Sequence, residues 1–369
     1  MPHLKGALAH SCAVCSDPTH STTGVSSSAS RRQFLAGGLA AFAAAPLLGH
    51  AAPAFAQAAL KPSRIDVHHH LTPPTLLDAL KSAQMGNPPT YNWTPQKSIE
   101  DMDKAGVSTA ITSITTPGVT FTDKEKARQL ARECNDYAAK LMQQFPGRFG
   151  MFATIPLTDT EGSLKEIEYA LDTLKADGIA LLTSYGDKWL GHESFAPVLA
   201  ELDRRKAVVY THPTAANCCR NLVTGIPDVL IEYGTDTTRT IASLVFSGQA
   251  AKTRNIRWIF SHAGGTMPFL IKRFTFLPNL PKRMGEIAPD GGLADLKRFY
   301  YDTAQASNPA AMAALMKLVS VSQVVFGTDY PFRTSEDHVK GLRNCGFSEA
   351  DLKAIEVDNP LSLLPRLKA

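Results

Sequence analysis

An alternation of short apolar segments with longer helical patterns, running from Lys61 onward, most constrains how this chain can fold. Eight segments are short, apolar and rich in β-branched residues, which is the pattern of buried strands. They are Arg64–His70, Ser108–Ile114, Phe149–Pro156, Gly178–Thr183, Ala207–His212, Ile256–His262, Phe299–Thr303 and Gln323–Gly327. Between most of them, apolar residues recur every three or four positions, as they do over Lys124–Gln144, Glu161–Ala176 and Thr238–Ala251.

Eight strand and helix repeats without a hairpin signal favour a closed parallel barrel, the (β/α)8 or TIM barrel of the α/β class. A doubly wound open sheet is the alternative. We expect Leu71–Gln96 to form a loop and a short helix over the mouth of the barrel. Helical patterns after the eighth strand are expected to pack outside the barrel, at Glu336–Gly341, Ser348–Glu356 and Pro360–Leu367.

The first 56 residues differ in composition from the rest of the chain. Ser30-Arg31-Arg32-Gln33-Phe34-Leu35 precedes an Ala- and Leu-rich stretch, and Ala54-Phe55-Ala56 follows it. The segment resembles a twin-arginine export signal, so we expect a signal peptide and leader over 1–56 and a mature barrel over 57–369. The resemblance implies a periplasmic protein, and the apolar stretch is too short to span a bilayer, so stable membrane insertion is not expected. An uncleaved anchor or a low-complexity tail is the alternative.

Cysteine and charge patterns exclude other classes of protein. Cys12 and Cys15 could form a zinc knuckle, but their segment lacks a second cysteine pair. The adjacent Cys218 and Cys219 are not expected to bridge each other. The net charge is only +4 and no stretch gathers basic residues, so a nucleic-acid partner is not expected.

Histidines gather where the carboxyl ends of the predicted strands lie, the face on which TIM barrels carry their active sites. His68 and His70 end the first strand, two positions apart, so their side chains point the same way while His69 points elsewhere. His212, His262 and Asp329 end the fifth, sixth and eighth strands. Imidazole suits zinc, and a catalytic metal needs only a few protein ligands. This order of residues predicts a metal site.

At these motifs the chain resembles the amidohydrolase superfamily, in particular its branch of aminocarboxymuconate-semialdehyde and 6-methylsalicylate-type decarboxylases. The resemblance is carried by Ile65–His70, Ser261–Gly265 and Phe326–Pro331. It implies that the metal ligands are His68, His70, His212 and Asp329, and that His262 is an acid/base residue beside them. It also implies that Arg273 binds the substrate carboxylate across a dimer interface, which predicts a homodimer.

Two departures from this branch bear on the substrate. Ser98 stands where the aminocarboxymuconate enzymes place a second carboxylate-binding arginine, and Lys97 is only a weak substitute. The first strand carries His-x-His instead of the Glu-x-His of the resorcylate decarboxylases. We therefore expect an aromatic acid with one carboxylate, and Trp93, Tyr185 and Phe332 could form flat walls around it. Core packing is the other reading of these aromatic side chains.

Several further residues have two interpretations. Asp302, at the end of the seventh strand, could orient a ligand histidine or cap the following turn. Arg273 could form a salt bridge within its helix instead of binding substrate. Structural roles are expected for His192, His338 and the pair Asp236 and Arg239.

The pattern predicts a metal-dependent non-oxidative decarboxylase of a salicylate-like or unsaturated carboxylic acid, with Zn2+ or another divalent ion such as Mn2+ as cofactor. The carbon that loses the carboxylate must be protonated, by Asp329 in one version and through His262 in the other. The main alternative is a hydrolase of an amide, ester or lactone that uses the same residues. A hydratase of an unsaturated diacid, and a binding or scaffolding protein that has lost its chemistry, are further alternatives.

Overall fold

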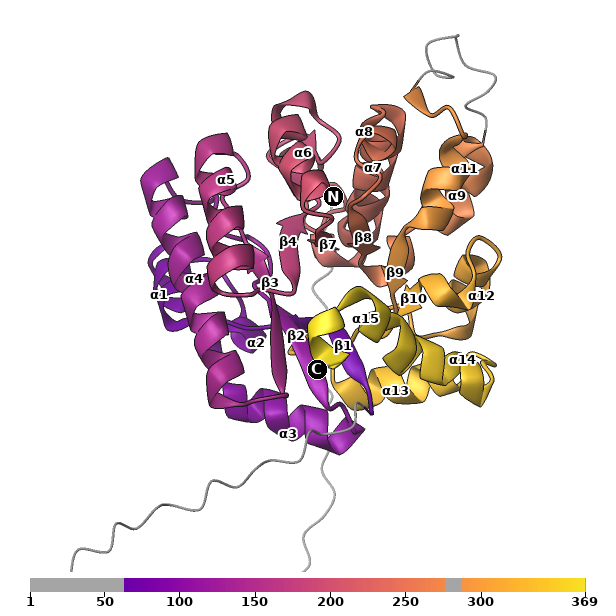
Figure 1. The fold of residues 1–369 in the computed structure, drawn as a ribbon, viewed down its shortest axis with the longest axis horizontal. Coiled ribbons are helices and arrows are strands. Elements are labelled where there is room, and N and C mark those ends of the chain that lie inside the picture. Colours follow the sequence, from indigo (N-terminus) through magenta and orange to yellow (C-terminus); the bar gives the residue numbers. More distant parts are fainter. Residues whose placement is uncertain (1–62, 276–286, 369) are drawn as a thin grey trace, which may run out of the picture. The chain divides into compact units, whose positions relative to one another are not determined.

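The computed structural model describes residues 63–275 and 287–368, and these form a barrel (Figure 1). Eight parallel strands follow one another in the order β1-β2-β3-β4-β7-β8-β9-β10. Their bounds are β1 Ile65–His70, β2 Thr109–Ser113, β3 Phe149–Thr154, β4 Gly178–Leu182, β7 Val208–His212, β8 Arg257–Phe260, β9 Tyr300–Asp302 and β10 Val324–Val325. Val67 N donates to Phe326 O at 3.0 Å, so the ring is nearly closed. The TIM-barrel prediction is confirmed; the predicted leader over 1–56 lies outside the described residues.

Two details of the strands differ from the sequence-based expectation. Strand β8 ends at Phe260, so His262 lies beyond it in a tight turn where both His262 and Ala263 have positive φ. The prediction that the chain contains no hairpin was wrong, because β5 (Ser184–Tyr185) and β6 (Lys188–Trp189) pair as an antiparallel hairpin after β4. Gly186, with φ +66°, supplies the left-handed conformation that this two-residue turn requires.

Helices lie outside the barrel and link its strands (Figure 1). Their bounds are α1 Pro74–Ser82, α2 Pro88–Tyr91, α3 Pro95–Ala105, α4 Lys124–Gln144, α5 Thr160–Glu168, α6 Ala196–Arg204, α7 Glu232–Phe246, α8 Gln249–Lys252, α9 Met267–Phe274, α11 Gly292–Arg298, α12 Pro309–Met316, α13 Ser335–Arg343, α14 Glu349–Lys353 and α15 Asn359–Leu363. None of the helices in these described stretches is long and apolar enough to cross a membrane.

Local sequence signals explain where the helices begin. Thr94, Asp123 and Asn308 each accept a hydrogen bond from a backbone N–H in the first turn of the helix that follows. Such capping satisfies donors that have no partner within the helix. Helix α4 has the bounds that its apolar periodicity predicts, whereas α7 begins at Glu232, six residues before the predicted start at Thr238.

Two apolar clusters hold the barrel together. The larger one packs the helices against the outer faces of the strands. The smaller one draws residues from strands all around the ring, so it fills the interior. Its members from the strands are Ile65, Val67, Ile111, Phe152, Ala180, Val208, Tyr210, Ile259 and Val325. The metal-site residues lie directly against this packed interior, where His68 and Tyr210 make an edge-to-face contact with ring centroids 5.2 Å apart.

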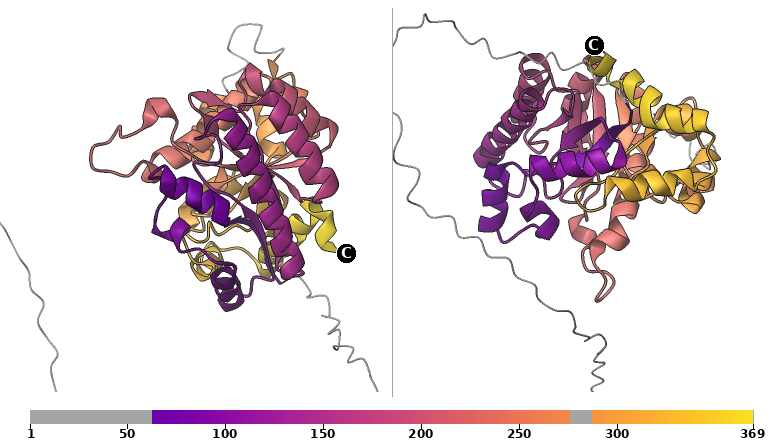
Figure 2. Two further views of the ribbon diagram at one scale, coloured as in Figure 1. Left: turned by 90° about the vertical axis from the view of Figure 1, so that its left-hand side faces the viewer. Right: turned by 90° about the horizontal axis from the view of Figure 1, so that it is seen from below.

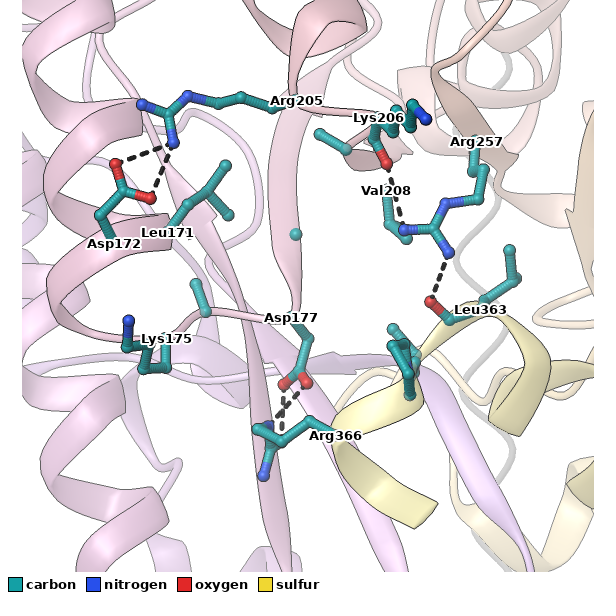
Figure 3. Close-up of a pocket in the computed structure, with 15 residues that line it drawn as sticks. Leu171, Asp172, Lys175, Asp177, Arg205, Lys206, Val208, Arg257, Leu363 and Arg366 are labelled. Atoms are coloured by element: carbon teal, nitrogen blue, oxygen red, sulfur yellow. Dashed lines mark hydrogen bonds and ion pairs between the residues drawn. The ribbon is translucent and has the colours of Figure 1, made fainter. Parts of the chain in front are cut away.

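The amino ends of the strands, at the opposite end of the barrel from the predicted site, carry a cavity of about 310 Å3 (Figure 3). Two ion pairs cross it, Arg205 with Asp172 and Arg366 with Asp177, each at 2.8 Å. Arg366 joins the C-terminal segment to the start of β4. This face therefore serves stability, as the amino-terminal face of TIM barrels usually does.

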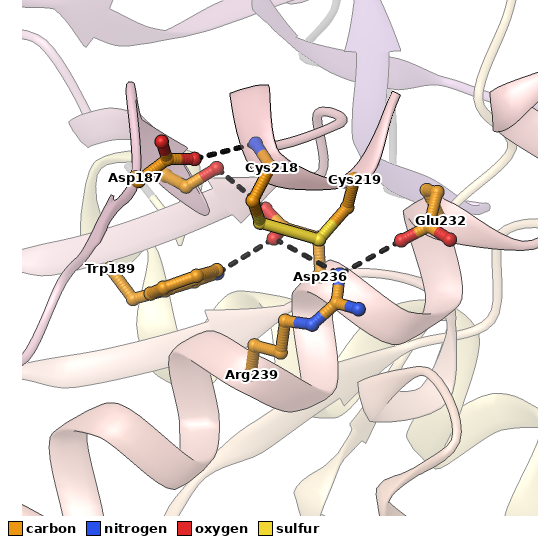
Figure 4. Close-up of a disulfide and its surroundings, with 8 residues drawn as sticks. Asp187, Trp189, Cys218, Cys219, Glu232, Asp236 and Arg239 are labelled. Atoms are coloured by element: carbon orange, nitrogen blue, oxygen red, sulfur yellow. Dashed lines mark hydrogen bonds and ion pairs between the residues drawn. A yellow bond between two sulfur atoms is a disulfide. The ribbon is translucent and has the colours of Figure 1, made fainter. Parts of the chain in front are cut away.

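The segment between β7 and α7 projects from the body of the barrel (Figure 2). It exposes apolar side chains, with Leu222 and Leu230 61% and 71% exposed. At its base Cys218 and Cys219 form a disulfide, which corrects the expectation that adjacent cysteines would not bridge (Figure 4). The backbone N–H of Cys218 also donates to Asp187 at 2.8 Å, in the β5–β6 turn. The local fold brings the two sulfurs together, which sequence adjacency alone did not predict.

Candidate metal centre

The four predicted metal ligands meet at the carboxyl-terminal end of the barrel. One ligand atom from each of His68, His70, His212 and Asp329 lies within 4.8 Å of the other three, and all four residues are buried. His68 and His70 come from the end of β1 and His212 from the end of β7, whereas Asp329 follows β10. Four strand-end positions far apart in sequence thus form a compact set of donors, as the sequence predicted.

The tautomers of the three histidines are set by what the other ring nitrogen contacts. His70 Nδ1 donates to Ser113 O at 3.2 Å, and His212 Nδ1 donates to Pro213 O at 2.9 Å. His68 Nδ1 lies 2.8 Å from Asp302 Oδ2. Each Nδ1 therefore carries a proton, and Nε2 is the atom of each ring that faces the cluster and can bind a cation.

This arrangement fits a divalent cation. His68 Nε2 and His70 Nε2 lie 3.1 Å apart, and Asp329 Oδ1 lies 3.0 Å from His70 Nε2. Three ring nitrogens and a carboxylate oxygen that converge in a buried space need a positive charge among them, which a bound divalent cation would supply. Imidazole nitrogens with one carboxylate oxygen are the donors that zinc and related ions prefer.

Burial and neighbouring charges shift the pKa values of these ligands in different directions. Burial lowers the pKa of His212 to about 3, which keeps this ring neutral and able to donate its lone pair. Burial also lowers the pKa of His68, but Asp302 and Asp329 outweigh it and raise that pKa to about 10. Burial tends to raise the pKa of Asp329, but the histidines around it hold it well below its usual range.

Asp302 takes both of the roles that the sequence left open. Its Oδ2 orients the ring of His68, and its Oδ1 accepts from the backbone N–H groups of His262 and Ala304 at 2.9 and 3.0 Å. The side chain is fully buried. One carboxylate thus positions a metal ligand and ties down the turn that carries His262.

The two carboxylate oxygens of Asp329 face different neighbours. Oδ1 points into the ligand cluster, whereas Oδ2 accepts from Gln305 Nε2 at 2.9 Å and lies 3.5 Å from His262 Nε2. His262 Nε2 is buried and makes no hydrogen bond within the described part of the chain. Asp329 has φ +63°, a strained value for this residue type that is common at functional sites. The structure thus brings His262 beside the metal ligands.

A cavity of about 580 Å3 opens onto His262 and Asp329. Apolar side chains form much of its wall, among them Val229, Leu230 and Phe332. The ring of Phe332 also meets the ring of His70 edge to face, with centroids 5.8 Å apart. Phe332 therefore lines the cavity beside the predicted ligands, and its contact with substrate stays a prediction.

Trp93 and Arg273, the other two predicted substrate contacts, do not line this cavity. Trp93 is buried in the outer core, and its Nε1 donates to Ser98 Oγ at 2.9 Å. Ser98 also contacts His69 Nε2 at 3.0 Å, so His69 points away from the metal ligands as expected. Arg273 is exposed near the end of α9. Substrate contacts by Trp93 and Arg273 stay predictions.

Sequence reasoning did not single out most of the cavity wall, including Tyr233, Gln305 and Arg333. Burial raises the pKa of Tyr233 to about 12, so this phenol stays protonated. Tyr233 was missed because the start of α7 was predicted too late. Gln305 follows Asp302 by three positions, and Arg333 follows Asp329 by four. Attention to the residues just after the strand ends could have found both of them.

Comparison with known proteins places this geometry in a family. The family model described as amidohydrolase matches residues 65–366. The chain belongs to the amidohydrolase family. A 6-methylsalicylic acid decarboxylase from Aspergillus aculeatus is 39% identical over 323 residues, which cover 83% of this chain and 97% of the relative. A 2-amino-3-carboxymuconate-6-semialdehyde decarboxylase from Dictyostelium discoideum is 26% identical over 249 residues, covering 66% of this chain and 68% of the relative.

Solved structures support the fold of this amidohydrolase. A 2,6-dihydroxybenzoate decarboxylase in complex with 2,6-dihydroxybenzoate superposes with a TM-score of 0.74 at 20% identity, covering 83% of this chain and all of the other. A dihydroxybenzoic acid decarboxylase from Polaromonas with bound manganese and an inhibitor gives 0.74 at 21% identity, covering 84% and 98%. At such identities the likeness shows the barrel fold.

Proposed function

We propose that this protein is a metal-dependent carboxy-lyase that removes the carboxyl group of a salicylate-like aromatic acid without oxidation. The observation that carries the proposal is the juxtaposition of a His3-Asp donor set with a buried, unpartnered His262 Nε2 in a partly apolar cavity. The decarboxylase relative at 39% identity over nearly its whole length favours this reaction over hydrolysis, which the donor set alone would also allow.

Different residues of the chain would bind the cation and hold the aromatic ring of the substrate. A divalent cation bound by His68, His70, His212 and Asp329 would supply an electrophilic anchor for the phenolic oxygen and carboxylate of the substrate. The apolar wall around Phe332 would hold the aromatic ring and exclude water.

In this proposal His262 is the residue that donates the proton. As the bond to the carboxyl carbon breaks and carbon dioxide leaves, the ring carbon must gain one proton. Asp329 Oδ1 faces the metal donors and Oδ2 already accepts from Gln305, so both oxygens act as acceptors. His262 Nε2 has no such commitment, and Asp329 Oδ2 at 3.5 Å is placed to stabilise its protonated ring. Between the two versions predicted from sequence, this geometry favours His262.

The test is release of carbon dioxide from a panel of hydroxybenzoates that includes 6-methylsalicylate, with the metal-loaded full chain. His262→Gln removes the proton donor but keeps all four ligands, so we expect it to retain metal and lose at least about 100-fold in kcat. His192→Gln, which alters a half-buried histidine that caps a short 3-10 helix, is the matched control. Absence of release by the wild type, together with cleavage of amides, esters or lactones, would instead establish the hydrolase.

The metal is proposed to be zinc, because three imidazole nitrogens and one carboxylate suit it. Manganese is the alternative, since one solved decarboxylase of the same fold holds it. Elemental analysis of protein purified without added metal, followed by activity measured after reconstitution with each ion, distinguishes the two.

Export by the twin-arginine route to the periplasm is proposed from Ser30-Arg31-Arg32-Gln33-Phe34-Leu35 and the apolar stretch after it. Replacement of Arg31 and Arg32 by lysine should leave the protein in the cytoplasmic fraction, and the N-terminus of exported wild type should be Gln57. Export that persists in the double variant would contradict the twin-arginine assignment.

A homodimer is proposed for the assembled enzyme. Phe269 is 73% exposed on α9, and Arg273 lies one helical turn further on the same helix. The projecting segment adds exposed apolar side chains such as Leu222 and Leu230, and burying such surface drives association. Sedimentation analysis should show a dimer for the wild type and a shift toward monomer for Phe269→Glu. A wild-type monomer at micromolar concentration would refute this assembly.

A further inference from the structure

The cavity that opens onto His262 and Asp329 has a single lysine or arginine among the described residues of its wall, Arg333. The rest of the wall is apolar or uncharged apart from the site residues themselves. A carboxylic acid that enters this cavity leaves water, so a positive charge and hydrogen-bond donors in addition to the proposed cation would stabilise it. Arg333 is placed to supply both.

Arg333 has spare hydrogen-bonding capacity. Its Nε donates to Gln305 Oε1 at 3.4 Å, near the upper limit for a hydrogen bond. Among residues 63–275 and 287–368, no carboxylate lies within ion-pair distance of its guanidinium. A guanidinium has five N–H donors in a planar fork that matches the two oxygens of a carboxylate.

Gln305 holds this arginine close to the reacting groups. Its side-chain Oε1 faces Arg333 and its Nε2 donates to Asp329 Oδ2 at 2.9 Å, so one amide group separates the two residues. The backbone of Gln305 is fixed by its N–H, which donates to the buried His338 Nε2 at 2.9 Å. On the other side, Phe332 N donates to Asp329 O at 2.9 Å and closes the turn that leads into Arg333. The side chain of Arg333 is therefore exposed to solvent, while these hydrogen bonds fix the turn that carries it and the amide group that it contacts.

We infer that Arg333 binds the carboxylate of the substrate and selects acids over neutral aromatic compounds. This inference rests on the proposed function for the identity of the substrate class. It assigns the carboxylate to an arginine of the same chain as the metal ligands, whereas the sequence pointed to Arg273. Arg273 lies outside the cavity wall and would have to reach the substrate from a partner subunit.

The charge of the substrate predicts which kinetic constant changes. The carboxylate loses its negative charge as it becomes carbon dioxide, so a cation bound to it stabilises the substrate at least as much as the transition state. Loss of Arg333 should therefore raise KM and leave kcat nearly unchanged. A residue needed only to maintain the shape of the site would lower kcat or the metal content instead.

The experiment compares two ligands of nearly equal shape, 6-methylsalicylate and its neutral carboxamide. Calorimetric titration of the metal-loaded full chain measures the ratio of their affinities, with every protein carrying His262→Gln so that the acid is bound without turnover. We expect the wild type to prefer the acid, and Arg333→Gln to lose about tenfold to a hundredfold of that preference, the value of a charge-assisted contact. Arg333→Lys keeps the charge without the fork and should fall in between. Arg343→Gln, at the end of α13, is the exposed-arginine control and should match the wild type.

Three results would overturn the inference. They are a wild type that does not prefer the acid, an Arg333→Gln protein that keeps the preference, and an Arg273→Gln protein that loses it while Arg333→Gln does not. Metal content and thermal unfolding of each variant show whether the fold is intact, and Arg333→Lys supplies the comparison should Arg333→Gln be unstable. Binding is measured without turnover, so a chain that selects acids through Arg333 but releases no carbon dioxide refutes only the proposed reaction.

Discussion

Asp302→Asn is the substitution that most sharply tests how the metal site is built. Asparagine has nearly the same shape, and its Oδ1 can still accept from the N–H groups of His262 and Ala304. Its amide nitrogen, however, replaces Oδ2 and donates to His68 Nδ1, from which the aspartate accepts at 2.8 Å. His68 must then place its proton on Nε2, the atom that faces the other ligands. The variant should fold and bind metal weakly.

The expected magnitude follows from this exchange of donor and acceptor. Loss of a carboxylate that orients a metal-binding histidine typically costs about 10- to 100-fold in metal affinity. That range corresponds to about 1.4–2.7 kcal/mol. We expect the upper part of the range, because both side chains are fully buried and water cannot replace the lost contact.

Competition with a chromogenic chelator measures the affinity of each variant for Zn2+ and Mn2+. Asp236→Asn is the matched control, because Asp236 is equally buried and accepts from Thr183, Ser184 and Trp189 away from the metal ligands. The control should lower the free energy of unfolding and leave metal affinity unchanged. Metal affinity of Asp302→Asn within twofold of the wild type would refute the assigned tautomer of His68.

Three further predictions concern stability. Gly327→Ala should lower both the metal affinity and the free energy of unfolding, because the new Cβ would stand 2.9 Å from His68 Cβ and 3.1 Å from Asp302 Cβ. Urea titrations should show a loss of about 1–3 kcal/mol in the free energy of unfolding. Unchanged values would contradict the tight packing at this position. Removal of metal by a chelator should lower Tm, since a ligand bound only by the folded state stabilises it, and the metal should restore Tm when added back. The hydrogen bond from Arg128 lowers the pKa of Asp159 to about 2, so this ion pair stabilises the fold above about pH 4 and loses its effect as the pH falls toward 2. The difference in Tm between the wild type and Asp159→Asn should therefore shrink over that interval. A difference in Tm that stays constant would exclude this ion pair as its source.

Much of the fold was predictable because its signals are local. The β-branched runs mark the eight strands, and the apolar repeat over Lys124–Gln144 marks α4 to the residue. Short polar signals were weaker: the Gly186 turn that makes the β5–β6 hairpin, and the start of α7 at Glu232, were both missed. In each case only a few residues carry the signal, too few for a period to show.

The metal ligands were predictable for a related reason. In a parallel barrel every strand points the same way, so residues at strand ends must share one face whatever their distance in sequence. His68, His70, His212 and Asp329 could thus be grouped from the sequence alone, and their predicted convergence is confirmed. Which Asp329 oxygen faces the cluster could not be read in this way, because it depends on side-chain torsions and on Gln305.

By itself, then, the sequence determined the order of strands, the face that carries the site and the kinds of donor atom on it, since these follow from periodicity and from residue type. Only the tertiary structure decided which side chains line the cavity. It placed Arg333 beside Gln305, buried Trp93 against Ser98 and left Arg273 on the surface. The reason is physical: the position of a side chain in a loop is set by contacts with residues distant in sequence, and such contacts leave no periodic pattern along the chain.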